Sequence, residues 1–157
     1  DAFRIVKKDM MVNSLKPSHD MTTEEVIMPV RSAGTYNFKG RRFKVEVLPW
    51  NSDMPLKQPD GVLIFDAAKL RFPFVLRGWR SGDWLIPLGM RGKKKVSDLF
   101  ADLKYDSIMK SRAVVLVDTM TEGLSDEGHV AGVAGVRIDD RYKVTQSTKT
   151  VIRLTLR

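Results

Sequence analysis

The segment spanning residues 72–102 reads FPFVLRGWRSGDWLIPLGMRGKKKVSDLFAD, and its pattern governs how the rest of the chain is interpreted. An extended apolar run comes first, and two glycine-containing turns follow it. The segment then enters a stretch with the i, i+3, i+4, i+7 spacing of one helical face, carried by Val96, Leu99, Phe100 and Leu103. Ser97 is the expected N-cap, so a helix is predicted to begin here.

Short strands are predicted on both sides of this segment. Apolar residues alternate with charged ones at residues 43–48, which is the two-residue period of a half-buried strand. A continuous apolar run at residues 113–117 predicts a buried strand. Further strands are expected at residues 25–30, 62–65, 72–79, 129–138 and 150–156, a polar hairpin loop at 121–128, and a second helical turn at 108–112. The predicted fold class is α+β and mostly antiparallel, with one or two short helices.

Length and composition narrow the class of protein. A chain of 157 residues makes one domain or two small lobes sharing a core. Cysteine is absent, which excludes a disulfide framework, thiolate chemistry and cysteine-bound zinc. The apolar runs are far shorter than the roughly 18 residues of a membrane span, so no membrane is expected as a partner. The first residues, DAFRIVKKDMMV, resemble no signal peptide and lack an initiator Met, so we expect a piece of a longer protein.

Positive charge is concentrated in the second half of the sequence. The net charge is +8 at pH 7. Residues 71–112 hold ten Lys or Arg against four Asp, and residues 137–157 hold six against two. Solvated lysines on an ordinary basic domain are one interpretation. The clustering favours a nucleic-acid partner instead.

The basic run at residues 93–95 stands directly before the predicted helix and close to two glycines. Ammonium groups and closely approaching backbone favour phosphate binding, with a solvated loop as the alternative. Residues 89–92 also match the GXXG loop of KH domains. That match is weak, because residues 132–135 match equally well inside an expected strand and because a KH loop joins two helices.

Trp79 and Trp84 flank a tight turn, where they either stack on bases or pack against the edge of the core, and packing is preferred. No catalytic residue is predicted, because no nucleotide-binding loop or nucleophile–base set occurs. Two histidines without ligands at suitable spacing predict no metal site. Asp139 and Asp140 are interpreted as local ion pairing or a turn.

Several motifs together resemble a known family. They run in order as FDAxKxxxP at residues 65–73, LRxWRxGD at 76–83, PLGMxGxKKxSDxF at 87–100, VLVD at 115–118 and VAGxRIDxRYKVT at 133–145. This series resembles the C-terminal region of tRNA(Ile)-lysidine synthases over residues 62–157. Residues 1–61 fit the linking, β-rich part that precedes the C-terminal domain in that family.

The resemblance implies a cytoplasmic bacterial ligase of which this chain is one part. The family uses ATP with Mg and free lysine to modify the wobble cytidine of a minor isoleucine tRNA, and this chemistry belongs to an N-terminal catalytic domain. No cofactor is expected in this chain itself. The implied fold is layered and contains a β-sandwich, like a domain of the phenylalanyl-tRNA synthetase β subunit. The implied role is to bind tRNA(Ile) on its acceptor-stem side.

The expected tRNA contacts follow the basic motifs and are Arg77, Arg80, Arg91, Lys93, Lys94, Lys95, Arg137, Arg141 and Lys143. Many members of the family place a basic residue directly after the Gly-Asp pair, whereas this chain has Trp84, so no contact is carried over to that position. The alternative function is a dimerisation or interdomain docking module, with a homodimer as a further expected partner.

Overall fold

The computed structural model describes residues 26–119 and 130–157. The predicted loop at 121–128 and both histidines lie outside these ranges. The strands are β1 (Ile27–Val30), β2 (Gly34–Phe38), β3 (Arg41–Pro49), β4 (Val62–Asp66), β5 (Phe74–Gly78), β6 (Trp84–Leu85), β7 (Lys94–Lys95), β8 (Val114–Asp118), β9 (Val130–Val133), β10 (Arg137–Ile138) and β11 (Thr150–Leu156). The helices are α1 (Val96–Asp102), α2 (Ser107–Arg112) and the 3-10 turn η3 (Asp140–Tyr142).

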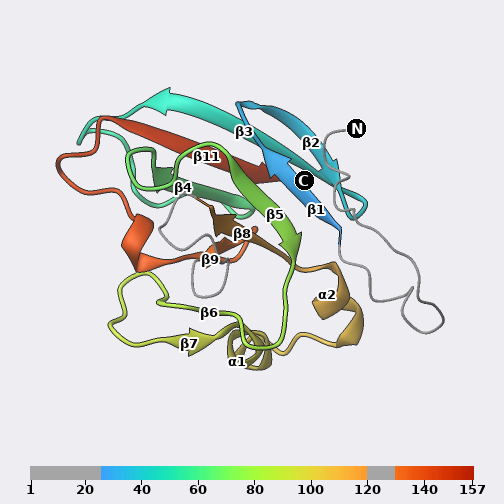
Figure 1. Ribbon diagram of the computed structural model, residues 1–157. Coiled ribbons are helices and arrows are strands. Elements are labelled where there is room, and N and C mark those ends of the chain that lie inside the picture. Colours follow the sequence, from blue (N-terminus) through green and yellow to red (C-terminus); the bar gives the residue numbers. More distant parts are fainter. Residues whose placement is uncertain (1–25, 120–129) are drawn as a thin grey trace.

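Two antiparallel sheets form a sandwich (Figure 1). One has the strand order β2-β3-β11-β4, and the other has the order β1-β5-β8-β9-β10. Their facing surfaces bury a continuous apolar cluster that includes Phe43, Phe65, Phe74 and Leu116. This burial supplies the main favourable term for folding. The predicted α+β class with antiparallel layers is confirmed.

Strand β8 is apolar from Val114 to Val117 because both of its faces are covered. Val114 and Leu116 belong to the cluster between the two sheets. Val115 and Val117 point to the opposite face and join a second cluster beneath α1. The short β6–β7 hairpin and α1 therefore form a third layer on the outer face of the five-stranded sheet (Figure 1).

Helix α1 is confirmed, but its predicted N-cap is wrong. The N-cap is Lys95, whose side chain makes no capping hydrogen bond, and Ser97 already lies inside the helix. Leu99 and Phe100 are buried as the spacing predicts. Leu103 is 40% exposed, because the helix ends there.

Two strand predictions need correction. The predicted strand at 129–138 consists of β9 and β10, which pair with each other through a turn containing Gly135 at a φ of 73°. Strand β2 was not among the strands predicted from the sequence, and its last residues run into the turn at residues 37–40. Residues 37–40 close a hairpin in which Lys39 and Gly40 both have positive φ, 52° and 74°, as a two-residue type I′ turn requires.

Strands from both sides of position 61 pair with each other. Strand β1 pairs with β5, and β3 pairs with β11 along seven residue pairs. The two predicted parts, 1–61 and 62–157, thus share both large sheets in the described residues. None of the helices in the described part of the chain is long and apolar enough to cross a membrane.

Candidate nucleic-acid interface

The turn before β6 is built around a buried ion pair between Arg77 and Asp83. Nη1 of Arg77 lies 2.9 Å from Oδ2 of Asp83, and Nη2 lies 3.0 Å from Oδ1. The backbone N–H of Arg80 donates to the same carboxylate at 2.7 Å. Asp83 therefore fixes both ends of the turn that begins the hairpin.

Arg77 is consequently not a surface cation, and its predicted tRNA contact is corrected. Its side chain has no exposed surface. The strand register pairs Arg77 with Val115, so its side chain enters the layer between the five-stranded sheet and α1. A buried guanidinium needs a carboxylate and hydrogen bonds, which Asp83 and the carbonyl oxygen of Gly78 provide.

The loop of the β6–β7 hairpin is held from a distant part of the chain by Asp139. This carboxylate is fully buried, and its Oδ2 accepts a hydrogen bond from the backbone N–H of Ile86 at 2.8 Å. Its Oδ1 accepts from the backbone N–H of Arg141 at 2.7 Å. Local ion pairing of Asp139 with Arg141 is confirmed, with Nη2 2.8 Å from Oδ2.

Asp140 makes a second link between the same two segments. Its backbone N–H donates to the carbonyl oxygen of Ile86 at 2.6 Å, and its Oδ1 accepts from the N–H of Gly89 at 3.0 Å. The hydrogen bond from Gly89 is the main cause that lowers the pKa of Asp140, and Lys143 lowers it further. The basic segments near residues 84–95 and 137–143, far apart in sequence, are thereby brought together.

Trp84 lies at the centre of this junction, between cations of both segments. Nζ of Lys93 lies 4.2 Å from the centroid of the Trp84 ring, and Cζ of Arg141 lies 5.0 Å from it. Both are within the range of a cation–π interaction. The aromatic ring thus holds two positive side chains at defined positions on the surface.

Trp79 has the structural role that was preferred for it. Its ring packs edge-on against Phe100, with centroids 5.3 Å apart. Its Nε1–H donates to the carbonyl oxygen of Lys110 at 2.9 Å, which links β5 to α2. The two tryptophans therefore differ, because Trp79 joins the core and Trp84 supports surface cations.

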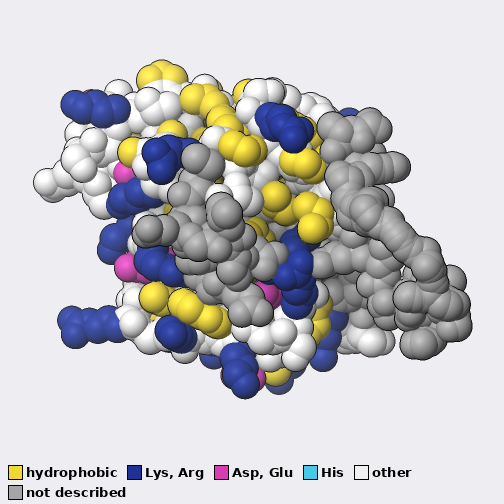
Figure 2. All heavy atoms as spheres, in the orientation of Figure 1, with side chains coloured by type: hydrophobic (Ala, Val, Ile, Leu, Met, Phe, Trp, Pro, Cys, Tyr) yellow, Lys and Arg dark blue, Asp and Glu magenta, His cyan; other side chains and the backbone are white. Residues whose placement is uncertain are grey.

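The remaining predicted contacts divide by their exposure. Arg91, Lys93 and Lys95 are exposed. Partly exposed positions are Arg80 and Arg137. Three others are exposed or partly exposed but paired with carboxylates, namely Lys94 with Asp102 at 2.6 Å, Arg141 with Asp139 and Lys143 with Asp140 at 3.3 Å. Figure 2 shows Lys and Arg side chains gathered along the left and lower edges of the molecule, on the side of the β6–β7 hairpin in Figure 1.

We name the cationic surface formed by the β6–β7 hairpin and η3 the hairpin face. Within it, the hydrogen bond to Asp139 raises the pKa of Arg141 above its ordinary value. The GXXG match at 89–92 lies in the connection between two strands rather than two helices, which argues against a KH loop. Within the described ranges, no group of three or more potential metal ligands occurs.

The chain has relatives among known proteins. No family model matches the chain. A tRNA(Ile)-lysidine synthase of Parabacteroides distasonis is 38% identical over 100 residues, which cover 64% of this chain and 21% of that protein. The corresponding protein of Bacteroides thetaiotaomicron is 39% identical over 88 residues, and that of Clostridioides difficile is 28% identical over 156 residues. The last match covers 94% of this chain and 32% of that protein, so the chain spans about a fifth to a third of these relatives.

A solved structure matches the fold. The crystal structure of the TilS C-terminal domain aligns with a TM-score of 0.66 and 18% identity, covering 85% of this chain and 97% of the other. Taken with the sequence matches, this confirms the resemblance to the C-terminal region of tRNA(Ile)-lysidine synthases.

Proposed function

We propose that this chain is the tRNA-binding, substrate-positioning domain of a tRNA(Ile)-lysidine synthase. The observation that carries the proposal is the joining of two distant basic segments into one hairpin face by Asp139 and Asp140. If the positive charge were incidental, the two basic segments would not need to be connected by buried hydrogen bonds. A surface that holds a polyanion in one pose needs its cations at fixed positions.

The hairpin face suits contact with the sugar–phosphate backbone of an RNA helix. Arg91, Lys93 and Lys95 are exposed, and Arg141 is oriented by Asp139. A-form RNA offers few readable base edges in its deep major groove, so a domain of this kind recognises mostly shape and phosphate positions. The acceptor-stem side of tRNA(Ile) is the contact that we propose.

The complete enzyme carries out its chemistry elsewhere. In the described residues, Arg77 belongs to a structural ion pair and Asp139 docks the hairpin. We propose that ATP with Mg and lysine are used by a catalytic domain of the longer protein, in the cytoplasm. In this proposal the present domain orients the tRNA so that the anticodon loop reaches that catalytic site.

The test is the salt dependence of RNA binding by this chain. Fluorescence anisotropy would measure the dissociation constant for a tRNA(Ile) transcript and for a minihelix of its acceptor stem, over a range of salt concentrations. We expect saturable binding to both, with affinity falling steeply as salt rises because counterions are released from the phosphates. If the chain binds neither RNA at low salt, the proposal is contradicted.

A docking or dimerisation role is the second candidate, and three exposed apolar side chains favour it. Leu103, Ile108 and Met109 on and between the two helices are 40%, 68% and 47% exposed. Apolar side chains of this size gain free energy when a partner covers them. Light scattering at several protein concentrations without RNA distinguishes this role, because it requires self-association that does not depend on RNA.

A further inference from the structure

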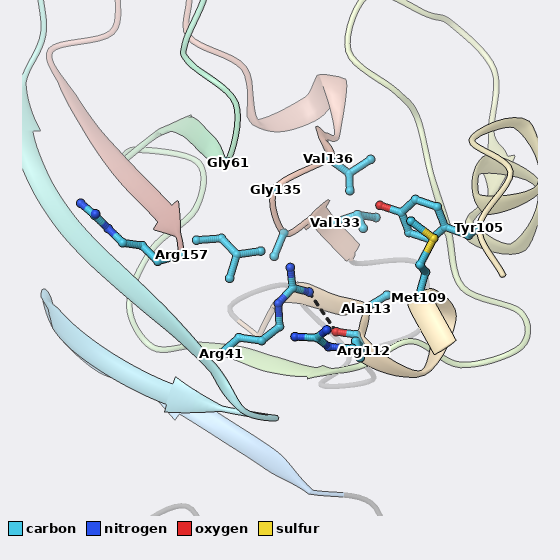
Figure 3. Close-up of a pocket in the computed structure, with 12 residues that line it drawn as sticks. Arg41, Gly61, Tyr105, Met109, Arg112, Ala113, Val133, Gly135, Val136 and Arg157 are labelled. Carbon is cyan, nitrogen blue, oxygen red and sulfur yellow. Dashed lines mark hydrogen bonds between the residues drawn. The ribbon is translucent and has the colours of Figure 1, made fainter. Parts of the chain in front are cut away.

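A cleft on another part of the molecule is lined by three arginines, of which two extend into it. It has a volume of about 350 Å³ and lies where the start of β3, the end of α2 and the β9–β10 turn meet (Figure 3). Arg41 and Arg112 enter it from β3 and α2. Neither residue belongs to the hairpin face, so this is a separate positively charged site.

The two arginines are held close together, and no carboxylate in the described part of the chain neutralises them. Nη1 of Arg41 donates a hydrogen bond to the carbonyl oxygen of Arg112 at 3.0 Å, drawn as a dashed line in Figure 3. Among residues 26–119 and 130–157, no ion pair joins either guanidinium to a carboxylate. Partial burial lowers the pKa of Arg41, and the charge of Arg112 lowers it further. Both features, observed within the described residues, are those of cations that can receive an anionic ligand.

The opposite side of the cleft is apolar and partly aromatic. Tyr105, Met109 and Val136 line it, and Figure 3 places them across from Arg41. The Tyr105 ring is fixed by stacking on Phe100, with centroids 4.9 Å apart and an angle of 7° between planes. A rigid apolar wall facing two guanidinium groups suits a ligand with one anionic end and one flat apolar end.

We propose that this cleft binds a nucleoside phosphate unit, with its phosphate on Arg41 and Arg112 and its base against Tyr105 and Met109. The volume is at the lower end of the range for small-ligand sites, which suits one nucleotide and no more. A paired base cannot enter, because its flat faces are covered by its neighbours in the helix. The ligand is therefore an unpaired nucleotide, either within an RNA strand or free.

The version with an RNA strand rests on the proposed tRNA-binding function. In that version the hairpin face holds the helical part of the RNA by its phosphates. The cleft holds a nucleotide outside the helix and so distinguishes RNA with an unpaired segment from a plain duplex. Arg157 lines the rim and points away from Arg41 in Figure 3, so it is not assigned to the phosphate.

The experiment uses the 157-residue chain and three labelled probes measured by fluorescence anisotropy. The probes are a single-stranded RNA pentanucleotide, an abasic strand of the same length and a blunt RNA duplex. Cytidine monophosphate serves as competitor and tests the free nucleotide. Arg112→Gln is the main variant, because the Arg112 side chain is exposed and makes no hydrogen bond within the described residues. Arg42→Gln is the matched control. This substitution removes the same charge from an exposed residue next to Arg41, and Arg42 does not line the cleft.

We expect Arg112→Gln and Arg41→Gln to weaken pentanucleotide binding by roughly tenfold each, while Arg42→Gln changes it little. The abasic strand should bind the native chain more weakly than the pentanucleotide. Met109→Ala, at a 47% exposed position, should reduce that difference without unfolding the chain. If cytidine monophosphate displaces the pentanucleotide from the native chain in a way that depends on Arg112, the free nucleotide is a ligand of the cleft. If it does not displace the pentanucleotide, the ligand is a nucleotide within an RNA strand.

Equal losses of pentanucleotide affinity in the Arg42→Gln and Arg112→Gln variants would overturn the proposed cleft site, because the overall positive charge would then explain binding. Equal affinity for the abasic and normal strands would overturn the base-binding wall. The double variant Lys93→Gln/Lys95→Gln separates this proposal from the proposed function. This variant should weaken binding of the duplex and leave the Arg112-dependent binding of the pentanucleotide unchanged. If the native chain binds the pentanucleotide but not the duplex, the result counts against the hairpin face and not against the cleft.

Discussion

The carboxylate of Asp139 and the guanidinium of Arg141 face each other in a two-pronged ion pair. Nε of Arg141 lies 2.9 Å from Oδ1, and Nη2 lies 2.8 Å from Oδ2. The same carboxylate holds the backbone N–H of Ile86, which places the β6–β7 hairpin against η3. One buried acid therefore sets both the direction of a surface cation and the position of a basic loop.

Replacing Asp139 by Ala should detach this loop. The N–H of Ile86 and the guanidinium of Arg141 lose their acceptor, and we expect the free energy of unfolding to fall by about 1–3 kcal/mol. Urea denaturation measures this loss, and amide hydrogen exchange should become faster at Ile86. Asp140→Ala is the control and should cost less, because its carboxylate is partly exposed. Unchanged exchange at Ile86 in Asp139→Ala would show that the loop is held by other contacts.

Removing the carboxylate of Asp83 should be more damaging. In Asp83→Ala the guanidinium of Arg77 stays buried without its acid, which typically costs about 3–5 kcal/mol. The double variant Arg77→Met/Asp83→Leu removes both charges and should recover much of that stability. Thermal and urea unfolding of both variants test this, and equal losses in both would contradict a buried-charge explanation.

Neutralising Lys93 and Lys95 together should flatten the salt dependence of tRNA binding. Each lost phosphate contact should reduce the slope of log affinity against log salt by roughly 0.7–0.9. Arg31→Gln/Lys57→Gln is the matched control, because it removes two exposed cations outside the hairpin face. The same slope in the native chain and in Lys93→Gln/Lys95→Gln, with folding intact, would exclude the hairpin from the RNA contact.

The Trp84 ring should contribute to RNA affinity through the cations that lie over it. Trp84→Ala removes the surface that positions Lys93 and Arg141, and we expect binding to weaken by about threefold. Trp50→Ala is the comparison, since Trp50 is also partly buried and lies in a loop away from these cations. Equal effects of both substitutions in anisotropy titrations would indicate a general loss of packing.

Stability should depend on pH through Asp140. The hydrogen bond from Gly89 lowers the pKa of this carboxyl in the folded protein below its ordinary value of 3.8. Its stabilising contribution is therefore complete above that value and is lost as the pH falls through the lower, folded value. Urea midpoints of the native chain and of Asp140→Asn should differ by a constant amount near neutral pH and converge in acid. A difference that persists unchanged as the pH falls far below 3.8 would contradict this assignment.

Local patterns predicted most of the scaffold. The spacing of Leu99 and Phe100 marked α1, and the continuous apolar run of β8 marked a strand buried on both faces. Such sequence patterns are informative because the burial of a residue follows the periodicity of the helix or strand that contains it. The β2–β3 hairpin was missed because Lys39 is an unusual residue for a left-handed turn position.

The arrangement of the hairpin face could not be predicted in the same way. Arg77 was counted with the exposed cations, because a charge count cannot show that Asp83 reaches back six residues to bury it. Asp139 was correctly interpreted as a local ion-pair partner, yet its bond to Ile86 spans 53 residues. The cleft at Arg41 and Arg112 likewise joins residues 71 positions apart. Contacts at this separation depend on the assembled sheets and leave no local pattern.

The position of β11 inside its sheet has a consequence for synthesis of the protein. Residues 150–156 pair with β3 on one side and β4 on the other, and β3 and β4 do not pair with each other. While a ribosome makes the chain, both earlier strands have a free hydrogen-bonding edge until Leu156 has emerged. Exposed edges of this kind invite pairing with other chains. Completion of the four-stranded sheet is therefore a late event in synthesis.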